Sequence, residues 1–366
     1  MQFVISNYPS NIYEKPIVID LFSGCGGLSL GFEMADFDVK LAIDNWEDAL
    51  VTYRFNHKNT DTLNADLLNL DPAKIEKDFN LHEVDVIIGG PPCQGFSVAG
   101  KRIIDDDRNK LYMSFVRFVN HFKPKAFVME NVPNILSIGN GAVKNAIIND
   151  FTALGYIVTY RVLIASDYGV PQNRRRAIFV GTLDGDYIFP EQTSEIRVTT
   201  KEAISDLPEN SINDGEKYPI APQSDYQRLM RKNSSTLNNH QISNHSSQTQ
   251  HIISLVPDGG NYKNLPLEFR NTRKVHIAWT RLNSKKPSIT IDTGHRHHFH
   301  YKFNRVPTVR ESARIQSFSD DFIFIGSKTS QYKQVGNAVP PLMANAIASQ
   351  LINSLYEKST SILQHS

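Results

Sequence analysis

The sequence predicts an α/β protein with one large domain and a smaller, loop-rich one. Short apolar runs of the kind that form buried strands alternate with segments of helical spacing, and 366 residues suffice for a large domain and a second. Several of these runs lead into glycine or acidic residues, and ligands of open α/β sheets bind beyond the carboxyl ends of the strands. The expected strands are residues 16–22, 39–43, 84–88, 124–129, 157–163 and 177–181. Helices are expected near residues 28–35, 111–121, 142–154, 305–318 and 342–356.

The first expected strand leads into a glycine-rich turn, SGCGG, and then into a helix. Gly24, Gly26 and Gly27 are more closely spaced than in the dinucleotide-binding pattern, but this order of elements brings backbone amides against an anionic or polar ligand. Asp44 follows the second strand about 20 residues further on, where an acid commonly binds ribose hydroxyls, and Asp66 comes later. The alternative is a plain tight turn, with acids that cap helices or face solvent.

A second loop, GGPPCQGFS at residues 89–97, follows the strand at 84–88. Its glycines let the backbone approach a ligand, and its prolines stiffen the chain just before Cys93. Cys93 is therefore a candidate nucleophile, with a buried structural cysteine as the alternative. The other cysteine is Cys25, so we expect a reducing cytoplasm and neither a disulfide scaffold nor a structural zinc site.

Two further groups of polar residues stand next to expected strands. Glu130 ends the fourth strand and is a candidate acid at the same sheet edge as Cys93. Gln172, Arg174 and Arg176 alternate ahead of the last strand, so their side chains are expected on one face. An arginine-rich surface turn is the alternative for these three residues.

Charge is unevenly distributed along the chain. The net charge is +1, yet residues 210–304 hold 13 Lys/Arg against 6 Asp/Glu, a local +7, together with eight of the 12 histidines. Strong periodicity fades from about residue 184, so this block suggests a module that faces a polyanion, with an ordinary solvated surface as the alternative. Beyond it, Thr308 and Glu311 fit a capping box. We expect no membrane span and no signal peptide, because no apolar run reaches about 18 residues and the N-terminus lacks a charged segment followed by an apolar one.

Taken in order, the motifs resemble those of one family, the cytosine-C5 DNA methyltransferases of bacterial restriction–modification systems. The matching segments are DLFSGCGGLSLGF, GGPPCQGFS, ENV, QNRRR, RESARIQSF and QVGNAVPP. The resemblance implies a DNA (cytosine-5-)-methyltransferase with the doubly wound, mostly parallel sheet that binds S-adenosylmethionine. Residues 1–183 and 328–366 would form this large catalytic domain, and residues 184–327 a small target-recognition domain.

The resemblance also assigns cofactor contacts. Asp44 would bind the ribose hydroxyls, where many relatives have glutamate, and Asp66 would bind the adenine amino group. Asn45 stands where some relatives place a tryptophan that stacks on adenine, and Trp46 comes one position late, so the stacking partner is left open. The full set is Asp20, Phe22, Gly24, Gly26, Asp44, Asn45, Asp66, Pro92, Leu111, Asn337 and Val339.

In the implied reaction, the thiolate of Cys93 adds to C6 of cytosine and makes C5 nucleophilic enough to accept the methyl group of the cofactor. Glu130 would protonate or hydrogen-bond N3, and Arg174 and Arg176 would bind O2 and a nearby phosphate. The base that removes the C5 proton is left open, with water as one candidate. The target cytosine must leave the duplex, because this chemistry cannot occur within the base stack.

Double-stranded DNA is the expected partner, with the small domain on its phosphates and base edges. The resemblance further implies a cytoplasmic, nucleoid-associated monomer without a metal, and a restriction endonuclease as a genetic partner that forms no stable complex. The target sequence is left open. The residues expected to contact DNA are Gln94, Ser97, Gln172, Arg273, Lys274, Lys285 and Lys286.

Three other functions were weighed against this one. A thiol hydrolase would need a histidine beside Cys93, and the histidines gather in the basic block instead. A tRNA-methylating relative would carry a Cys-Phe-Thr segment before its last motifs, and this chain has no cysteine after Cys93. A catalytically inactive DNA-binding homologue would be expected to lack Cys93, Glu130 or Arg176, and all three are present.

Overall fold

A computed structural model describes residues 14–92, 110–193, 197–270, 279–294 and 298–363 of the chain. The chain divides into two compact units. The first comprises Met1–Ile164, Arg175–Glu191 and Met343–Ser366, and the second comprises Ala165–Arg174 and Gln192–Leu342. Within the described parts, no helix is long and apolar enough to cross a membrane.

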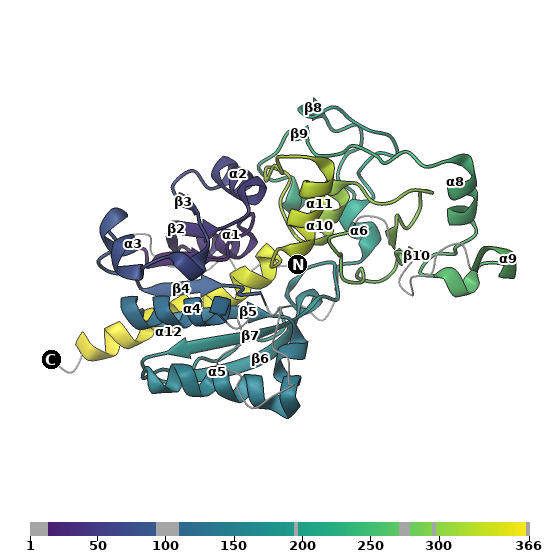
Figure 1. The fold of residues 1–366 in the computed structure, drawn as a ribbon. Coiled ribbons are helices and arrows are strands. Elements are labelled where there is room, and N and C mark those ends of the chain that lie inside the picture. The colour runs from purple at the N-terminus through teal and green to yellow at the C-terminus, as the bar shows by residue number, and fades with distance from the viewer. Residues whose placement is uncertain (1–13, 93–109, 194–196, 271–278, 295–297, 364–366) are drawn as a thin grey trace. The chain divides into compact units, whose positions relative to one another are not determined.

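The first unit is built on a seven-stranded sheet with the strand order β3-β2-β1-β4-β5-β7-β6 (Figure 1). All neighbours are parallel except β7, which runs antiparallel to both β5 and β6. The strands are β1 (Ile17–Leu21), β2 (Asp38–Asp44), β3 (Asp61–Asn64), β4 (Val86–Gly89), β5 (Ala126–Asn131), β6 (Ile157–Ile164) and β7 (Arg175–Thr182). The order reverses direction between β1 and β4, and this kind of switch point is where open α/β sheets place their ligands.

Helices pack on both faces of this sheet. The main apolar core lies on one face, where strand residues such as Ile19 and Phe127 meet α3, α4 and α5 through side chains such as Phe115 and Phe151. Asp20 alternates with Ile19 along β1 and so faces the other side, where it contacts α1. The helices are α1 (Gly27–Met34), α2 (Glu47–Asn56), α3 (Pro72–Asp78), α4 (Lys110–Phe122), α5 (Ala142–Ala153) and α12 (Pro341–Leu363).

The helices α1 and α12 approach each other closely at Gly31. A Cβ atom added to Gly31 would lie 2.3 Å from the Cβ atom of Ala344, so glycine is the residue that allows this contact. The C-terminal helix therefore belongs to the first unit from Met343 onward.

The second unit consists of short elements joined by long connections, as the loss of periodicity predicts. Its helices are α6 (Thr200–Ile204), α7 (Asp225–Met230), α8 (Ser247–Ser254), α9 (Leu267–Arg270), α10 (Val309–Ile315) and α11 (Lys328–Asn337). The described part of the unit also contains two short strand pairs, β8 (Glu216–Lys217) with β9 (Thr236–Leu237) and β10 (Thr280–Arg281) with β11 (His298–Phe299). The predicted capping box is confirmed, because the Thr308 side chain accepts from the Glu311 amide and the Glu311 side chain accepts from the Thr308 amide.

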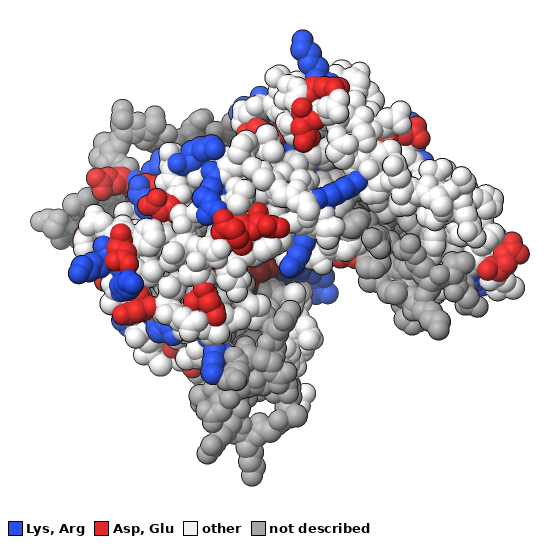
Figure 2. Space-filling model, turned by 45° about the horizontal axis from the view of Figure 1, so that its top comes forward, with Lys and Arg blue, Asp and Glu red and all other residues white. Residues whose placement is uncertain are grey.

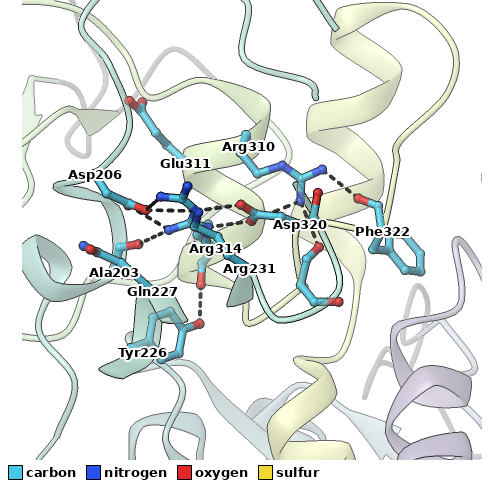
Figure 3. A network of polar contacts seen from close by, with 12 residues as sticks. Ala203, Asp206, Tyr226, Gln227, Arg231, Arg310, Glu311, Arg314, Asp320 and Phe322 are labelled. Carbon is cyan, nitrogen blue, oxygen red and sulfur yellow. Dashed lines mark hydrogen bonds and ion pairs between the residues drawn. The ribbon is translucent and has the colours of Figure 1, made fainter. Parts of the chain in front are cut away.

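Buried charged side chains form a network in the second unit (Figure 3). Arg314 of α10 is fully buried and donates to Asp206 at 2.9 Å and to Asp320 at 2.6 Å. Arg310, also fully buried, donates to the carbonyl of Phe322 at 2.7 Å. The RESARIQSF motif thus supplies buried ion pairs that join separate segments of the unit.

Replacing Arg314 with alanine should lower the free energy of unfolding by about 3–5 kcal/mol, because Asp206 and Asp320 both lose their fully buried shared cation and keep the less close Arg231, at 3.1 Å, and Arg310, at 3.7 Å. The measurement is chemical denaturation of the whole chain. Arg228→Ala is the matched control, since Arg228 pairs with Asp225 at the exposed surface of the same unit and should cost below about 1 kcal/mol. Equal effects of the two changes would contradict the structural role of Arg314.

The boundaries between the units differ from the expected domain boundaries. Residues 165–174 and 328–342 group with the second unit, whereas residues 184–191 group with the first. The contacts explain this grouping, because Tyr332 of α11 donates to the carbonyl of Pro307 at 2.6 Å and Arg174 donates to that of Gly336 at 2.8 Å. The assignment of a catalytic and a target-recognition domain stays a prediction.

Candidate active site and cofactor site

The glycine-rich turn after β1 adopts an unusual backbone conformation. Phe22, Gly24 and Gly26 have φ values of 61°, 55° and 94°, and at Phe22 this left-handed conformation is adopted by a bulky side chain. Asp44 at the end of β2 fixes the turn, because one of its carboxylate oxygens accepts from the Gly24 amide and the other from the Trp46 amide, both at 2.8 Å. Asp44 thereby joins the turn to the start of α2.

Asp20 lies below this turn and is buried. Its Oδ2 atom accepts a hydrogen bond from Ser29 Oγ at 2.5 Å, and Ser29 Oγ in turn accepts from the Tyr53 hydroxyl at 2.8 Å. The Oδ1 atom of Asp20 is buried and has no hydrogen-bond partner among the described residues. Neither Ser29 nor Tyr53 was predicted as a site residue, because only the fold brings α2 against α1.

The other predicted cofactor residues are placed as follows. Asp66 caps a short 3₁₀ helix by accepting from the Leu68 amide at 3.0 Å. Asn45 is exposed and Trp46 is half-buried, so the geometry does not single out a stacking partner.

Leu111 is half-buried in the first turn of α4, and Pro92 is exposed at the end of the described segment. Two belong to the second unit, where Asn337 ends α11 and Val339 is buried.

The loop that carries Cys93 begins directly beside Glu130. Cys93, Gln94 and Ser97 themselves lie outside the described residues. Asn131 donates to the carbonyl of Pro91 at 2.8 Å, and a Cβ atom added to Gly90 would lie 3.0 Å from Glu130 Oε2. The segment after β4, Gly90 and Pro91, therefore packs against the end of β5, and Cys93 follows Pro91 by two residues. Asn131 was not predicted as a site residue, although it follows Glu130 in the ENV motif.

Glu130 and Arg176 form a close ion pair between Glu130 Oε1 and Arg176 Nε. Each side chain is 13% exposed, so the pair is largely removed from water but still open to it. The antiparallel pairing of β5 with β7 places the two residues together, because Glu130 stands opposite Ile178, two residues beyond Arg176. A carboxylate and a guanidinium are thus held side by side at the carboxyl edge of the sheet.

Two residues predicted to act on DNA are buried instead. Gln172 is 0% exposed, and its amide donates to Gln316 and to the carbonyl of Ile315 while accepting from the Ile291 amide. The side-chain amide of Gln172 is thus engaged inside the second unit, and its contact with DNA stays a prediction.

Arg174 is also buried, at 1% exposure, and donates to the backbone carbonyls of Ile291 and Gly336. These contacts join separate segments of the second unit, whereas Arg176 belongs to the first unit and pairs with Glu130. The contact of Arg174 with a base or phosphate stays a prediction.

The second cysteine, Cys25, is buried in the glycine-rich turn. Burial is the main cause that raises the pKa of its thiol to about 12, and the negative charges of Asp44 and Asp20 add to the shift. Because the thiolate is the reactive form, Cys25 is inert near neutral pH.

The basic residues expected on DNA are only partly described. Lys285 and Lys286 are exposed in a turn of the second unit, whereas Arg273 and Lys274 lie outside the described residues. On the face drawn in Figure 2, the described Lys and Arg side chains are scattered among Asp and Glu and form no single-sign patch. Among the described residues, no group of histidine, cysteine and acidic side chains could hold a metal ion.

Comparison with known proteins agrees with this arrangement. A family model described as C-5 cytosine-specific DNA methylase matches residues 17–353. The chain is 42% identical to the Type II methyltransferase M1.HphI of Haemophilus parahaemolyticus over 96% of this chain and 90% of that one. It is 39% identical to the Type II methyltransferase M.DdeI of Desulfomicrobium norvegicum, with 94% and 92% covered.

Solved structures show the same fold. The crystal structure of a candidate DNA modification methyltransferase encoded within an E. coli prophage matches with a TM-score of 0.78 at 30% identity, covering 93% of this chain and all of that one. The structure of an Entamoeba histolytica methyltransferase matches with a TM-score of 0.60 at 18% identity, covering 94% and 99%, and supports the fold alone. The sheet order, the ordered motifs and the family match lead to one conclusion: the chain belongs to the C-5 cytosine-specific DNA methylase family and is a DNA (cytosine-5-)-methyltransferase.

Proposed function

We propose that this enzyme methylates C5 of one cytosine within a specific duplex sequence, through a covalent bond between Cys93 and C6 of a base flipped out of the helix. The observation that carries the proposal is the Glu130–Arg176 ion pair, which stands against Gly90 where the Cys93 loop begins. A nucleophile, an acid and a cation are what addition to a cytosine ring requires.

Each of these three residues has a distinct part in the reaction. The Cys93 thiolate forms a bond to C6, the C5–C6 π pair forms a C4–C5 double bond, and the C4–N3 π pair moves onto N3, where it takes up a proton. The enamine that results is nucleophilic at C5. Glu130 hydrogen-bonds or protonates N3 as negative charge develops, and Arg176 stabilises charge near O2. After methylation, loss of the C5 proton and of the C6–sulfur bond restores the aromatic ring and the free thiol.

The turn after β1 fits S-adenosylmethionine, which supplies an electrophilic methyl group when bound. Asp20 keeps a buried oxygen without a protein partner among the described residues, and a Cβ atom added to Gly24 would meet nothing within 4 Å. Helix α1 begins at Gly27, and no side chain caps the amino end of this helix at Gly26, so the helix amides there are candidates to bind a polar ligand. Asp44 and Asp66 would bind the ribose and adenine, as the family resemblance implies.

The second unit would read the DNA and bind its phosphates. Relatives at 42% and 39% identity are named Type II methyltransferases, so we infer that this enzyme protects host DNA within a Type II restriction–modification system. Such an enzyme acts independently of its endonuclease, and no stable complex between the two is needed.

Removing the two basic pairs from the second unit should weaken DNA binding without changing cofactor binding. Changing Arg273, Lys274, Lys285 and Lys286 to alanine should flatten the salt dependence of DNA affinity by roughly one unit of slope for each phosphate that the protein no longer neutralises. A salt titration of DNA binding and a calorimetric titration of the cofactor measure the two effects. The charge-matched control compares two double variants that each remove two lysines. Lys74→Ala/Lys77→Ala in α3 should leave the salt dependence of DNA affinity unchanged, whereas Lys285→Ala/Lys286→Ala should flatten it. If the slope is unchanged in both, Lys285 and Lys286 are ordinary surface residues.

The proposed function is tested by methyl transfer from labelled S-adenosylmethionine to duplex DNA and, separately, to tRNA. We expect incorporation into DNA alone, and sequencing that reports 5-methylcytosine in context should find it within one recurring sequence. Incorporation into tRNA alone, or 5-methylcytosine without sequence preference, would overturn the proposal.

A further inference from the structure

A chain of buried hydroxyl groups ends on the carboxylate of Asp20. The Tyr53 hydroxyl donates to Ser29 Oγ at 2.8 Å, and Ser29 Oγ donates to Asp20 Oδ2 at 2.5 Å. All three residues are at most 1% exposed. Each hydroxyl carries one proton, so when Ser29 donates to Asp20 its oxygen is left to accept from Tyr53. Both donors therefore support the same carboxylate oxygen.

The other oxygen of Asp20 receives no hydrogen bond from the described residues. Oδ1 is buried without a hydrogen-bond partner among the described residues, which is costly for a carboxylate. Burial raises the pKa of Asp20 to about 8, and the charges of Asp44 and Glu33 add to the shift. A cation at Oδ1 would relieve that cost, because it favours the charged carboxylate.

The surroundings of Asp20 also favour a cation. Glu33 on α1 and Asp44 on β2 both act on Asp20 electrostatically. From α2, Tyr53 stacks on His57 at 4.1 Å, and His57 Nδ1 lies 2.8 Å from Glu33 Oε2. The only thiol described in this turn, Cys25, is held neutral by burial. Acidic groups thus converge below the glycine-rich turn.

We propose that Ser29 and Tyr53 are positioning residues for the cofactor: their hydroxyls orient the Asp20 carboxylate so that Oδ1 receives the positively charged amino group of S-adenosylmethionine, and they thereby set cofactor affinity and its dependence on pH. This inference rests on the proposed cofactor site. Ser29 and Tyr53 would touch no cofactor atom themselves and would act on the cofactor through Asp20.

The experiment measures affinity for S-adenosylhomocysteine, the product that S-adenosylmethionine becomes after giving up its methyl group and that keeps the same amino group. Affinity is measured by calorimetry between pH 6 and pH 9 in the whole protein. The variants are Ser29→Ala, Tyr53→Phe and the double variant. Asp20 must be ionised to bind a cation, so affinity should rise with pH below about 8 and then level off. The Ser29 hydrogen bond lowers the pKa of Asp20, so its loss should move the levelling point to higher pH.

At pH 7 we expect about tenfold weaker binding in Ser29→Ala, which corresponds to one pKa unit, and about threefold weaker binding in Tyr53→Phe. Because Tyr53 acts through Ser29, the double variant should bind no more weakly than Ser29→Ala. A merely structural role for both residues would give additive losses and no shift of the pH profile. Titration of the ligand's own amine is common to all the proteins, so differences between their curves report on Asp20.

Tyr156→Phe is the matched control. Tyr156 is equally buried in the same unit and donates to the carbonyl of Pro124 at 2.7 Å, so its change removes a comparable hydrogen bond away from Asp20. Its pH profile should match that of the wild-type protein. If Ser29→Ala and Tyr53→Phe also superimpose on the wild type, the inference is wrong, whereas a wild-type protein that binds no cofactor would overturn the proposed function itself.

Discussion

Replacing Cys93 with serine should reduce methyl transfer by at least about a thousandfold while cofactor and DNA affinity stay close to those of the wild type. A serine hydroxyl is hardly ionised at neutral pH, so attack on C6 stalls. Cys25 cannot substitute for the lost nucleophile, because burial raises the pKa of its thiol to about 12. The measurement is single-turnover methyl transfer alongside gel-shift and calorimetric binding.

The binding measurements on the Cys93→Ser protein serve as the control for this change. A Cys93→Ser protein that still binds cofactor and duplex DNA shows that the loss lies in the chemical step. Turnover within tenfold of the wild type would contradict the covalent mechanism, whatever the binding data show.

Replacing Glu130 with glutamine should slow methyl transfer by about 10²–10⁴, because an amide can donate a hydrogen bond to N3 but cannot transfer a proton. The change also removes the ion pair with Arg176, so Arg176 should lose its fixed position at the sheet edge. Rates at saturating cofactor and DNA measure the effect on the chemical step.

Asp85→Asn is the matched control for Glu130→Gln. Asp85 pairs with Lys125 at 2.7 Å and accepts from the Ile17 amide at 2.8 Å, directly before β4 and so at the opposite edge of the same sheet. Losing this pair should cost stability but leave the rate of methyl transfer unchanged. Equal slowing by the two variants would mean that Glu130 acts only through the stability of the sheet.

The sheet could be predicted from the sequence because its central strands are short apolar runs. The runs around Val18, Ile87 and Val128 became β1, β4 and β5. β3, by contrast, has the polar sequence DTLN, lies half-exposed at the sheet edge and was missed. Its place depends on pairing with β2, which no local pattern reveals.

The positions of the glycine-rich turn, Glu130 and Arg176 near strand ends could be predicted, because each follows or begins an apolar run and matches a family motif; their roles stay predictions. The burial of Gln172 and of Arg174 could not, because their hydrogen-bond partners lie more than a hundred residues away in the chain. The Asp206–Arg314 ion pair could not be predicted either, because its two residues are separated by 108 positions in the sequence. Long-range partners decide whether a polar residue faces a ligand or the interior.

Trapping the reaction with 5-fluorocytosine tests the covalent mechanism most directly. Once the target sequence is mapped, a duplex with 5-fluorocytosine at the methylated position is incubated with the enzyme and S-adenosylmethionine and analysed on a denaturing gel. Fluorine at C5 cannot leave as a proton, so the wild-type protein should form a stable adduct that peptide mass analysis assigns to Cys93. A protein that methylates ordinary DNA yet forms no adduct, or forms one at Cys25, would contradict the mechanism.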